Sequence, residues 1–545
     1  MSVRLQLQLG DYAELVADRL AAWGSNDILA RMWARDHTVW SAEPVAELTD
    51  RLGWLTLPSQ LAETISDLEA FGEQLISDGV RHVVVLGMGG SSLAPEVFFN
   101  TFGSAAGAPE LRVLDSTHPG AVLAIEEAID LTRTVFIVAS KSGTTIEPLS
   151  FMEYFWHRVA GLVDDPGRHF VATTDPGSKL EAVARERNFR KTFLAPPDVG
   201  GRYSALTEFG MVPAASIGAD LEALRAAASE AQENNAASAS IAQSAGCRLG
   251  ATIGELALAG RDKITFLTGP ELTAFPAWIE QLIAESTGKE GRGVVPIGGE
   301  PLGTADVYGP DRFFVVIETA EGTPLDTTAI RKHPIAFLRL DSLSDLSGAM
   351  YLFEVATALA GAVLGIQPFD QPDVQVAKEL ARDAMAGTLD LTDVVEIDAM
   401  VPDLADRIAA WLGSAQPGDY VGIQAFIEPT AEARSILSEA RISVRDHKNL
   451  ATTLDFGPRF LHSTGQLHKG GPNTGVFLEI IDNAAPDVPV PTTEYGFAKL
   501  VKAQSLGDHL ALRQRDRRVL LLSLGDNGTE ALRRVSDAVI TASAE

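Results

Sequence analysis

The 545-residue chain has little cysteine, little positive charge and no long apolar run, and each shortage excludes a class of protein. Its single cysteine, Cys247, cannot form an intrachain disulfide and leaves no cysteine-based metal site. Lysine and arginine total 44 against 73 aspartates and glutamates, and the resulting net charge of −29 repels nucleic acid and anionic membranes. No uninterrupted apolar run reaches about 18 residues, the length of a membrane span, and the N-terminus lacks the apolar centre of a signal peptide. We therefore expect a cytoplasmic protein with neither nucleic acid nor a membrane as partner.

The chain does contain a regular alternation of short apolar strands and helical segments. Helical patterns fill roughly the first 78 residues, around 12–23, 26–33 and 58–77. Alternation of strands and helices, with glycine- or serine-rich exits from the strands, predicts an α/β fold with doubly wound parallel sheets. The predicted strands are 82–86, 111–114, 135–139, 170–172, 264–267, 313–317, 335–338, 421–426, 476–481 and 519–522. The predicted helices among the later strands are 275–286, 344–364, 431–444 and 497–513.

The pattern divides into three units. A helical N-terminal segment and a first parallel-sheet domain occupy residues 1–230, a second such domain 231–395, and a smaller α/β unit 396–545. A polar, alanine-rich helical stretch over 220–245 marks the first boundary. The second and third units share a strand, a proline-bearing turn, a helix and a Gly-Pro pair, which suggests duplication. Because any two α/β units look alike at this level, the alternative of unrelated units stays open.

The strand at 135–139 ends in a hydroxyl-rich loop, Ser140 to Thr145, that leads into a helix. N–H groups of such a loop and of the first helical turn point outward, and the helix dipole favours negative charge. An ordinary helix cap is the alternative, since serine and threonine are favoured there. Four hydroxyls and Lys141 within six residues favour a phosphate-binding loop instead.

A second loop, 87–92, follows the predicted strand at 82–86. It lacks the third glycine of a dinucleotide-binding loop. Gly89 and Gly90 allow close approach of the backbone to a ligand, and Ser91 can donate a hydrogen bond. Because ligands sit at the carboxyl ends of the strands in such sheets, we expect this loop to form the second wall of one sugar-phosphate pocket.

Three further segments carry groups able to do chemistry. Arg202 lies in a glycine-flanked tight loop, where the alternative is a solvated arginine. Gln281 and Glu285 are four residues apart on one helix face, so Glu285 could serve as a general base or merely pair with Lys289. The loop holding His462 and His468 has neither zinc-ligand spacing nor a nearby carboxylate, so we expect a histidine acting as acid or base and no metal.

Together these motifs resemble those of glucose-6-phosphate isomerases, a family of tandem sugar-isomerase (SIS) domains. The resemblance spans about residues 31–525 and is closest to the isomerase part of bifunctional transaldolase/glucose-6-phosphate isomerase proteins. It implies SIS-type domains and a phosphate site beside Lys141. The residues expected to hold the substrate phosphate are Gly89, Gly90, Ser91, Ser140, Ser142 and Thr145.

The resemblance also implies catalytic roles. Arg202 stabilises an enediolate, Glu285 moves a proton between C1 and C2, and Gln281 is a nearby polar contact. His462, in a His-x-x-x-Gln segment, assists ring opening. The run 369–378 matches a Phe-Asp-Gln signature in which Gln371 contacts substrate and Lys378 contacts the ring oxygen.

The order of these motifs along the chain departs from the family, because here the segment with His462 follows both the segment with Glu285 and the run 369–378. In ordinary family dimers that histidine comes from the partner chain. If the third unit copies the second, the histidine position of the second falls near Gly303 and the glutamate position of the third near Ser443. Neither side chain can replace the missing group, so we hypothesise that the third unit delivers His462 to the pocket of Glu285.

The sequence therefore predicts an aldose–ketose isomerase of glycolysis and gluconeogenesis. It would interconvert glucose 6-phosphate and fructose 6-phosphate by ring opening and a cis-enediol proton transfer, with no cofactor and no metal. A homodimer is the family expectation, and a monomer is the alternative because three units share one chain. Two other functions stay open: a dual phosphoglucose/phosphomannose isomerase, and a catalytically inactive sugar-phosphate-binding protein.

Overall fold

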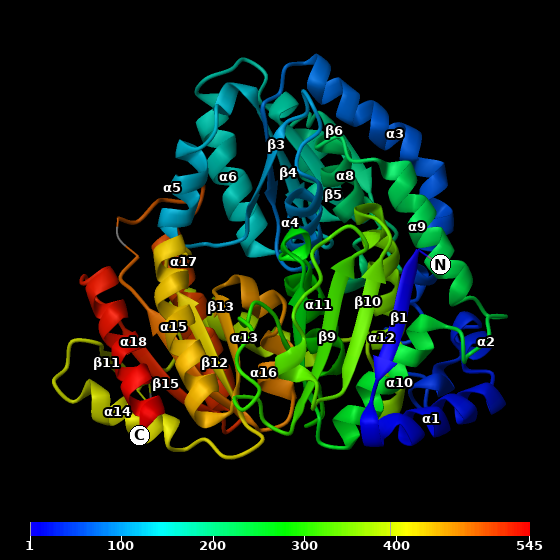
Figure 1. The fold of residues 1–545 in the computed structure, drawn as a ribbon. Helices are drawn as coiled ribbons and strands as arrows, with labels where there is room; N and C mark the ends of the chain where they lie inside the picture. Colours follow the sequence, from blue (N-terminus) through cyan, green and yellow to red (C-terminus); the bar gives the residue numbers. More distant parts are fainter. Residues whose placement is uncertain (1, 393, 485) are drawn as a thin grey trace.

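Three five-stranded sheets, each covered by helices, make up the computed structural model, which describes residues 2–392, 394–484 and 486–545. Figure 1 shows the first sheet at one end of the molecule, with the second and third sheets side by side beneath it. The predicted α/β fold with parallel sheets is confirmed.

The first sheet has the order β3-β2-β4-β5-β6, and all its strands are parallel. Its strands are β2 (His82–Leu86), β3 (Glu110–Leu114), β4 (Thr134–Ala139), β5 (Phe170–Thr174) and β6 (Lys191–Leu194). The helices of this region are α3 (Leu57–Ser77), α4 (Gly90–Phe102), α5 (Pro119–Glu127), α6 (Ile146–Ala160), α7 (Lys179–Glu186), α8 (Glu208–Ser216) and α9 (Leu221–Asn234). The hydroxyl-rich loop lies at the carboxyl end of β4, as predicted.

The second sheet has the order β1-β10-β9-β7-β8. Its strands are β1 (Val3–Gln8), β7 (Lys263–Thr268), β8 (Val295–Ile297), β9 (Arg312–Thr319) and β10 (Ile335–Leu340). Its helices are α1 (Ala13–Ser25), α2 (Ile28–Trp33), α10 (Ala245–Leu258), α11 (Phe275–Thr287) and α12 (Leu346–Leu364). The prediction of helices alone near the N-terminus was wrong, because β1 adds an antiparallel edge strand to β10.

The third sheet has the order β11-β15-β14-β12-β13. Its strands are β11 (Glu396–Asp398), β12 (Tyr420–Phe426), β13 (Ala451–Phe456), β14 (Gly475–Ile481) and β15 (Arg518–Ser523). Its helices are α14 (Leu404–Leu412), α15 (Ala431–Lys448), α16 (Gly465–Gly470), α17 (Phe497–Arg513) and α18 (Gly528–Ala544), and α13 (Pro372–Ala386) precedes it. The third predicted unit, 396–545, is the shortest of the three, and its sheet also has five strands.

All three sheets share one strand order. In each, one inner strand (β2, β7 or β12) is flanked by the next strand along the chain on one side and by the following two on the other, and the far edge strand is β6, β1 or β11. His462 lies as far beyond the end of β13 as Gly303 lies beyond β8. Ser443 likewise lies as far beyond β12 as Glu285 lies beyond β7. The common topology supports the duplication that the sequence left open.

The third unit packs against both others. An apolar cluster joins α11 and β8 of the second unit to the third, through Ala284, Val295, Ile297, Tyr420, Ala451, Leu467, Phe477 and Leu512. A second cluster joins α6 of the first unit to Val488, Val490, Phe497 and Leu500. Burial of apolar area at roughly 25 cal/mol per Å² makes such contacts the main source of docking energy. The carboxyl ends of the first sheet therefore face residues of the third unit.

One helix among the described residues, Leu343–Leu364, is long and apolar enough to cross a membrane. Buried residues make up 89% of its apolar window, and it packs against α9, α10 and α11. We interpret it as a core helix, because its surface is covered by the protein's own elements.

Candidate active site

His462 lies at the end of a short 3-10 turn, Arg459–His462, between β13 and α16. Its Nε2 atom is 2.9 Å from Oε1 of Glu147, in the first turn of α6. Three residues earlier, Arg459 forms ion pairs with Asp115 and Glu96 of the first unit. The turn that carries the histidine is therefore fixed to the first unit on two sides.

The charge state of Glu147 defines how His462 is protonated. Burial opposes ionisation of this carboxyl, but the charge and hydrogen bond of His462, helped by Lys378, outweigh it and lower the pKa of Glu147. An ionised carboxylate only accepts hydrogen bonds, so Nε2 of His462 carries the hydrogen. In the neutral imidazole, Nδ1 then carries no hydrogen and is the ring nitrogen that accepts one.

Gln281 connects His462 to Glu285 across the second and third units. Its Nε2 atom donates to Oε2 of Glu285 at 3.1 Å and to the backbone oxygen of His462 at 2.8 Å. Helix α11 places both side chains on one face, as the four-residue spacing predicted. Glu285 and the backbone of His462, which the sequence separates by 177 residues, are thus joined through one amide.

Arg202 is buried beside Glu285, with 2% of its surface exposed. Its Nη1 atom lies 3.4 Å from Oε1 of Glu285 and donates to Oε1 of Gln371 at 2.6 Å, while Nε donates to Oγ of Ser286 at 2.8 Å. These partners hold the guanidinium rigidly, so its positive charge is fixed next to the carboxylate. The alternative of a solvated arginine was wrong.

Two glycines let the first unit approach these groups. A β-carbon on Gly89 would lie 2.6 Å from the backbone oxygen of His462 and 2.7 Å from Nε2 of Gln281. A β-carbon on Gly90 would lie 1.9 Å from the backbone oxygen of Gly201, next to Arg202. Only glycine fits at either position. The predicted loop 87–92 therefore touches both the histidine and the arginine segments.

A cavity of about 680 Å³ opens between α6, α13 and α17. His462, Lys378 and Gln504 line it together with Ser142, Thr144 and Thr145 of the hydroxyl-rich loop. Within that loop Ser140 donates to Oγ1 of Thr145 at 3.2 Å, and the hydroxyls of Ser142 and Thr144 are 2.7 Å apart. The cavity thus places the hydroxyl-rich loop and four basic side chains, Lys378, Arg382, His462 and Lys469, in one space.

Two lysines take partners that the sequence did not indicate. Lys141, expected beside the phosphate, donates to Oδ1 of Asp175 at 2.9 Å and lies outside the cavity lining. Lys289 is buried and donates to Oδ1 of Asp370 at 2.6 Å, so the alternative pairing with Glu285 was wrong. Burial, then the charge of Arg202, lowers the pKa of Lys289 to about 8.

Sequence reasoning missed several polar residues of the site. Gln466 on α16 accepts from the backbone N–H of Asp373 at 2.9 Å and donates to Oδ2 of that residue at 2.8 Å, which ties α13 to the histidine segment. Glu147 was not singled out from the sequence, and Gln504 lay only within the predicted helix 497–513. Glu147 and Gln504 are each 4% exposed, and this burial appears only in the folded chain.

His468 does not join His462. Its Nδ1 atom is 2.9 Å from the hydroxyl of Tyr420, and burial lowers the pKa of this imidazole well below its ordinary value. Over the described ranges, no three His, Cys, Asp or Glu side chains cluster as metal ligands would.

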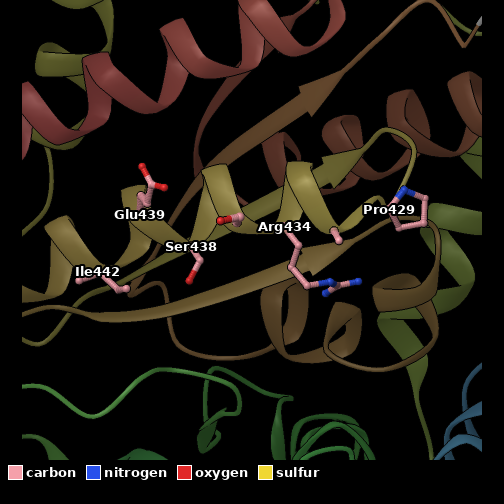
Figure 2. Close-up of a pocket in the computed structure, with 7 residues that line it drawn as sticks. Pro429, Arg434, Ser438, Glu439 and Ile442 are labelled. Atoms are coloured by element: carbon pink, nitrogen blue, oxygen red, sulfur yellow. The ribbon is translucent and has the colours of Figure 1, made fainter.

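A second hollow lies along α15, remote from the predicted site residues. Figure 2 shows Pro429, Arg434, Ser438, Glu439 and Ile442 along this outer helix face. None of the residues predicted to bind or transform a substrate lines it. The cavity with His462 is therefore the candidate active site.

Comparison with known proteins places the sequence among isomerases. A family model described as phosphoglucose isomerase matches residues 59–295. The glucose-6-phosphate isomerase of Rubrobacter xylanophilus is 30% identical over 394 residues, which cover 61% of this chain and 89% of the relative. That of Thermus thermophilus is 29% identical over 389 residues, covering 62% and 90%.

Solved structures show the same fold. A hypothetical protein from Thermus thermophilus has a TM-score of 0.61 at 26% identity, covering 70% of this chain and 100% of that chain. A glucose-6-phosphate isomerase from Chlamydia trachomatis has a TM-score of 0.50 at 19% identity, covering 71% and 81%, which is a likeness of fold. With a relative 30% identical along 89% of its own length, the chain belongs to the glucose-6-phosphate isomerase family.

Proposed function

We propose that the protein interconverts glucose 6-phosphate and fructose 6-phosphate, with its own Glu285, His462, Arg202 and Lys378 as catalytic groups. The observation that carries this proposal is the amide bridge of Gln281, which joins Glu285 to the His462 segment. The carboxylate proposed as base for a carbon-bound proton therefore lies next to the segment of the histidine proposed for ring opening, although Glu285 itself does not line the cavity that His462 lines. Aldose–ketose isomerisation needs both groups in that relation.

Ring opening comes first. The substrate phosphate binds at the hydroxyl-lined end of the cavity, with Ser142 and Thr145 donating to its oxygens. Nδ1 of His462 takes the proton of the C1 hydroxyl, while the ammonium of Lys378 gives a proton to the ring oxygen as its bond to C1 breaks. Both side chains line the cavity, and Glu147 keeps the imidazole oriented through its other nitrogen.

Proton transfer between carbons follows. Glu285 removes the C2 proton of the open-chain aldose, a cis-enediol forms, and the same carboxyl returns the proton to C1. Arg202 places a fixed positive charge where the enediolate oxygens develop, a stabilisation worth about 3–4 kcal/mol per donor. Gln281 holds the carboxylate by its hydrogen bond at 3.1 Å.

All of these groups belong to one chain. The first unit supplies the hydroxyl-rich loop and Arg202, the second supplies Glu285, and the third supplies His462. We therefore propose that His462 acts within its own chain and that a monomer suffices, with a cytoplasmic location and no cofactor. A homodimer remains compatible with this arrangement, since no partner residue is needed.

Glu285→Gln tests the proposal. Loss of the base should lower kcat by on the order of 10²–10⁴ with fructose 6-phosphate as substrate, measured through a coupled glucose-6-phosphate dehydrogenase. Glu290→Gln, at an exposed turn just beyond the helix, is the matched control and should keep wild-type kcat. Full turnover by Glu285→Gln contradicts the assigned base, and no turnover by the wild type contradicts the proposed function.

A further inference from the structure

A chain of three hydrogen bonds leads from the first unit through the third to His462. The hydroxyl of Thr117, in the loop after β3, donates to Oε1 of Gln504 at 2.6 Å. Nε2 of Gln504, on α17, donates to Oε1 of Glu147 at 2.7 Å. The same carboxylate oxygen lies 2.9 Å from Nε2 of His462. Gln504 is thus the connecting link between the third unit and the carboxylate that orients the histidine.

The chemistry of the partners fixes the direction of every bond. An ionised carboxylate only accepts, so the amide nitrogen of Gln504 must face Glu147 and its oxygen must face Thr117. Thr117 and Gln504 are 0% and 4% exposed, so bulk solvent has little access to these bonds, and Gln504 faces only the cavity. The amide therefore has one orientation, and it holds the carboxylate oxygen from the side opposite His462.

A merely structural role would not require a polar side chain at this position. Near Gln504, α17 buries the apolar Phe497, Leu500 and Val501 and also the polar Ser505, Asp508 and His509. A buried amide costs free energy unless both its ends are hydrogen-bonded. Here both ends are bonded, and one of the partners is the carboxylate that positions His462.

We propose that Gln504 is a positioning residue for the isomerisation, with Thr117 as its support. It fixes the rotamer of Glu147 and thereby holds His462 with Nδ1 toward the substrate. Its effect on turnover rests on the proposed function, whereas its effect on the histidine does not. The third unit therefore supplies both the histidine and the group that aligns the carboxylate behind it.

Gln504→Met keeps the size of the side chain and removes both hydrogen bonds. We expect kcat for the cyclic substrates to fall by roughly tenfold or more, since misplacement of a catalytic group by 1 Å can cost about 10²-fold. KM should change less than about twofold, because the phosphate loop is untouched. The matched control is Gln232→Met. The Gln232 side chain is also buried, at 8% exposure, and its amide likewise forms two hydrogen bonds, accepting from the hydroxyl of Ser59 and donating to the backbone oxygen of Leu55.

A double-mutant cycle distinguishes positioning from structural damage. In a His462→Ala background, Gln504→Met should cause no further loss of kcat, because its effect passes through the imidazole. An equal loss in both backgrounds, an unchanged kcat of the single variant, or an equal loss in Gln232→Met overturns the proposal. If Gln504→Met does not fold, Thr117→Val removes only the supporting hydroxyl. It should lower kcat by a smaller factor, and this loss should again be absent in the His462→Ala background.

A measurement without turnover separates this proposal from the proposed function. In protein labelled with ¹⁵N-histidine, the Nε2–H signal of His462, identified by its loss in His462→Ala, reports the bond to Glu147. We expect it to shift or broaden in Gln504→Met and to stay unchanged in Gln232→Met. An unchanged signal in Gln504→Met overturns the positioning role, whereas a wild type inactive on both sugar phosphates overturns the proposed function alone.

Discussion

Gly89→Ala is the sharpest test of how the three units meet. Gly89 precedes α4 with φ +57° and ψ −126°, a backbone conformation that essentially only glycine adopts. A β-carbon there would lie 2.6 Å from the backbone oxygen of His462, whereas ordinary contact begins at 3.4 Å. The methyl group therefore pushes the histidine segment away by about 0.8 Å, the difference between these distances.

The expected loss has two parts. Backbone strain costs about 1–3 kcal/mol of stability, and it affects the fold rather than the chemistry. Displacement of His462 lowers kcat by roughly 10- to 100-fold, because a shift of 1 Å can cost about 10²-fold. The second clash, with Nε2 of Gln281 at 2.7 Å, is relieved more easily because that atom ends a flexible side chain.

Gly103→Ala provides the matched control at the other end of the same helix. Gly103 follows α4 with φ +64° and ψ −166°, and a β-carbon there would meet no atom within 4 Å. Thermal unfolding should show a similar loss of stability in both variants, and the coupled dehydrogenase assay should show a kcat defect in Gly89→Ala alone. Full kcat in Gly89→Ala, or an equal defect in Gly103→Ala, would refute the reasoning.

Three further predictions concern His462, subunit number and pH. His462→Ala should lower kcat for cyclic substrates far more than for open-chain ones, and near-normal turnover on both contradicts its role in ring opening. Specific activity should stay constant on dilution to concentrations at which light scattering shows only monomer, whereas a decline would mean that a partner chain completes the site. Burial, then the charge of Asp455, raises the pKa of Glu280 to about 8 from 4.5, so the folded state keeps a proton that the unfolded chain releases between those values. Stability should therefore fall as pH rises from about 5 to 8, and Glu280→Gln should weaken that slope of melting temperature against pH; an unchanged slope contradicts the raised pKa.

The sequence predicted those parts of the fold in which local pattern and final burial agree. Continuous apolar runs such as Val135–Ala139 are buried parallel strands, and the structure confirms them. Strand β13 was missed because it reads Ala-Thr-Thr-Leu-Asp-Phe, with no apolar run. Its Thr452 is buried only because Arg441 and Glu300 bond it across the contact between the second and third units. No local pattern contains that information.

The candidate site divides in the same way. Residue types on strand-end loops and helix faces could be selected from the sequence, as with Glu285 and Arg202. The direction of a long side chain could not be selected: Lys141 donates to Asp175, a carboxylate just beyond the end of the neighbouring strand β5, and does not line the cavity. Gln504 could not be found either, since a glutamine on an amphipathic helix is usually exposed. Only the docking of α17 against α6 turns it inward.

The convergence at Gly89 also sets when activity returns during refolding. Most strands of each sheet come from one stretch of the chain, whereas β1 joins the second sheet from the N-terminal segment and β11 pairs with the distant β15. The reacting groups, in contrast, come together only after the segment with His462 has docked against both other units. Recovery of turnover should therefore lag behind recovery of the fluorescence of Trp54 and Trp278, which are buried in the bodies of the molecule. In this protein, recovery of enzyme activity therefore reports the last step of folding, the docking of the segment that carries His462.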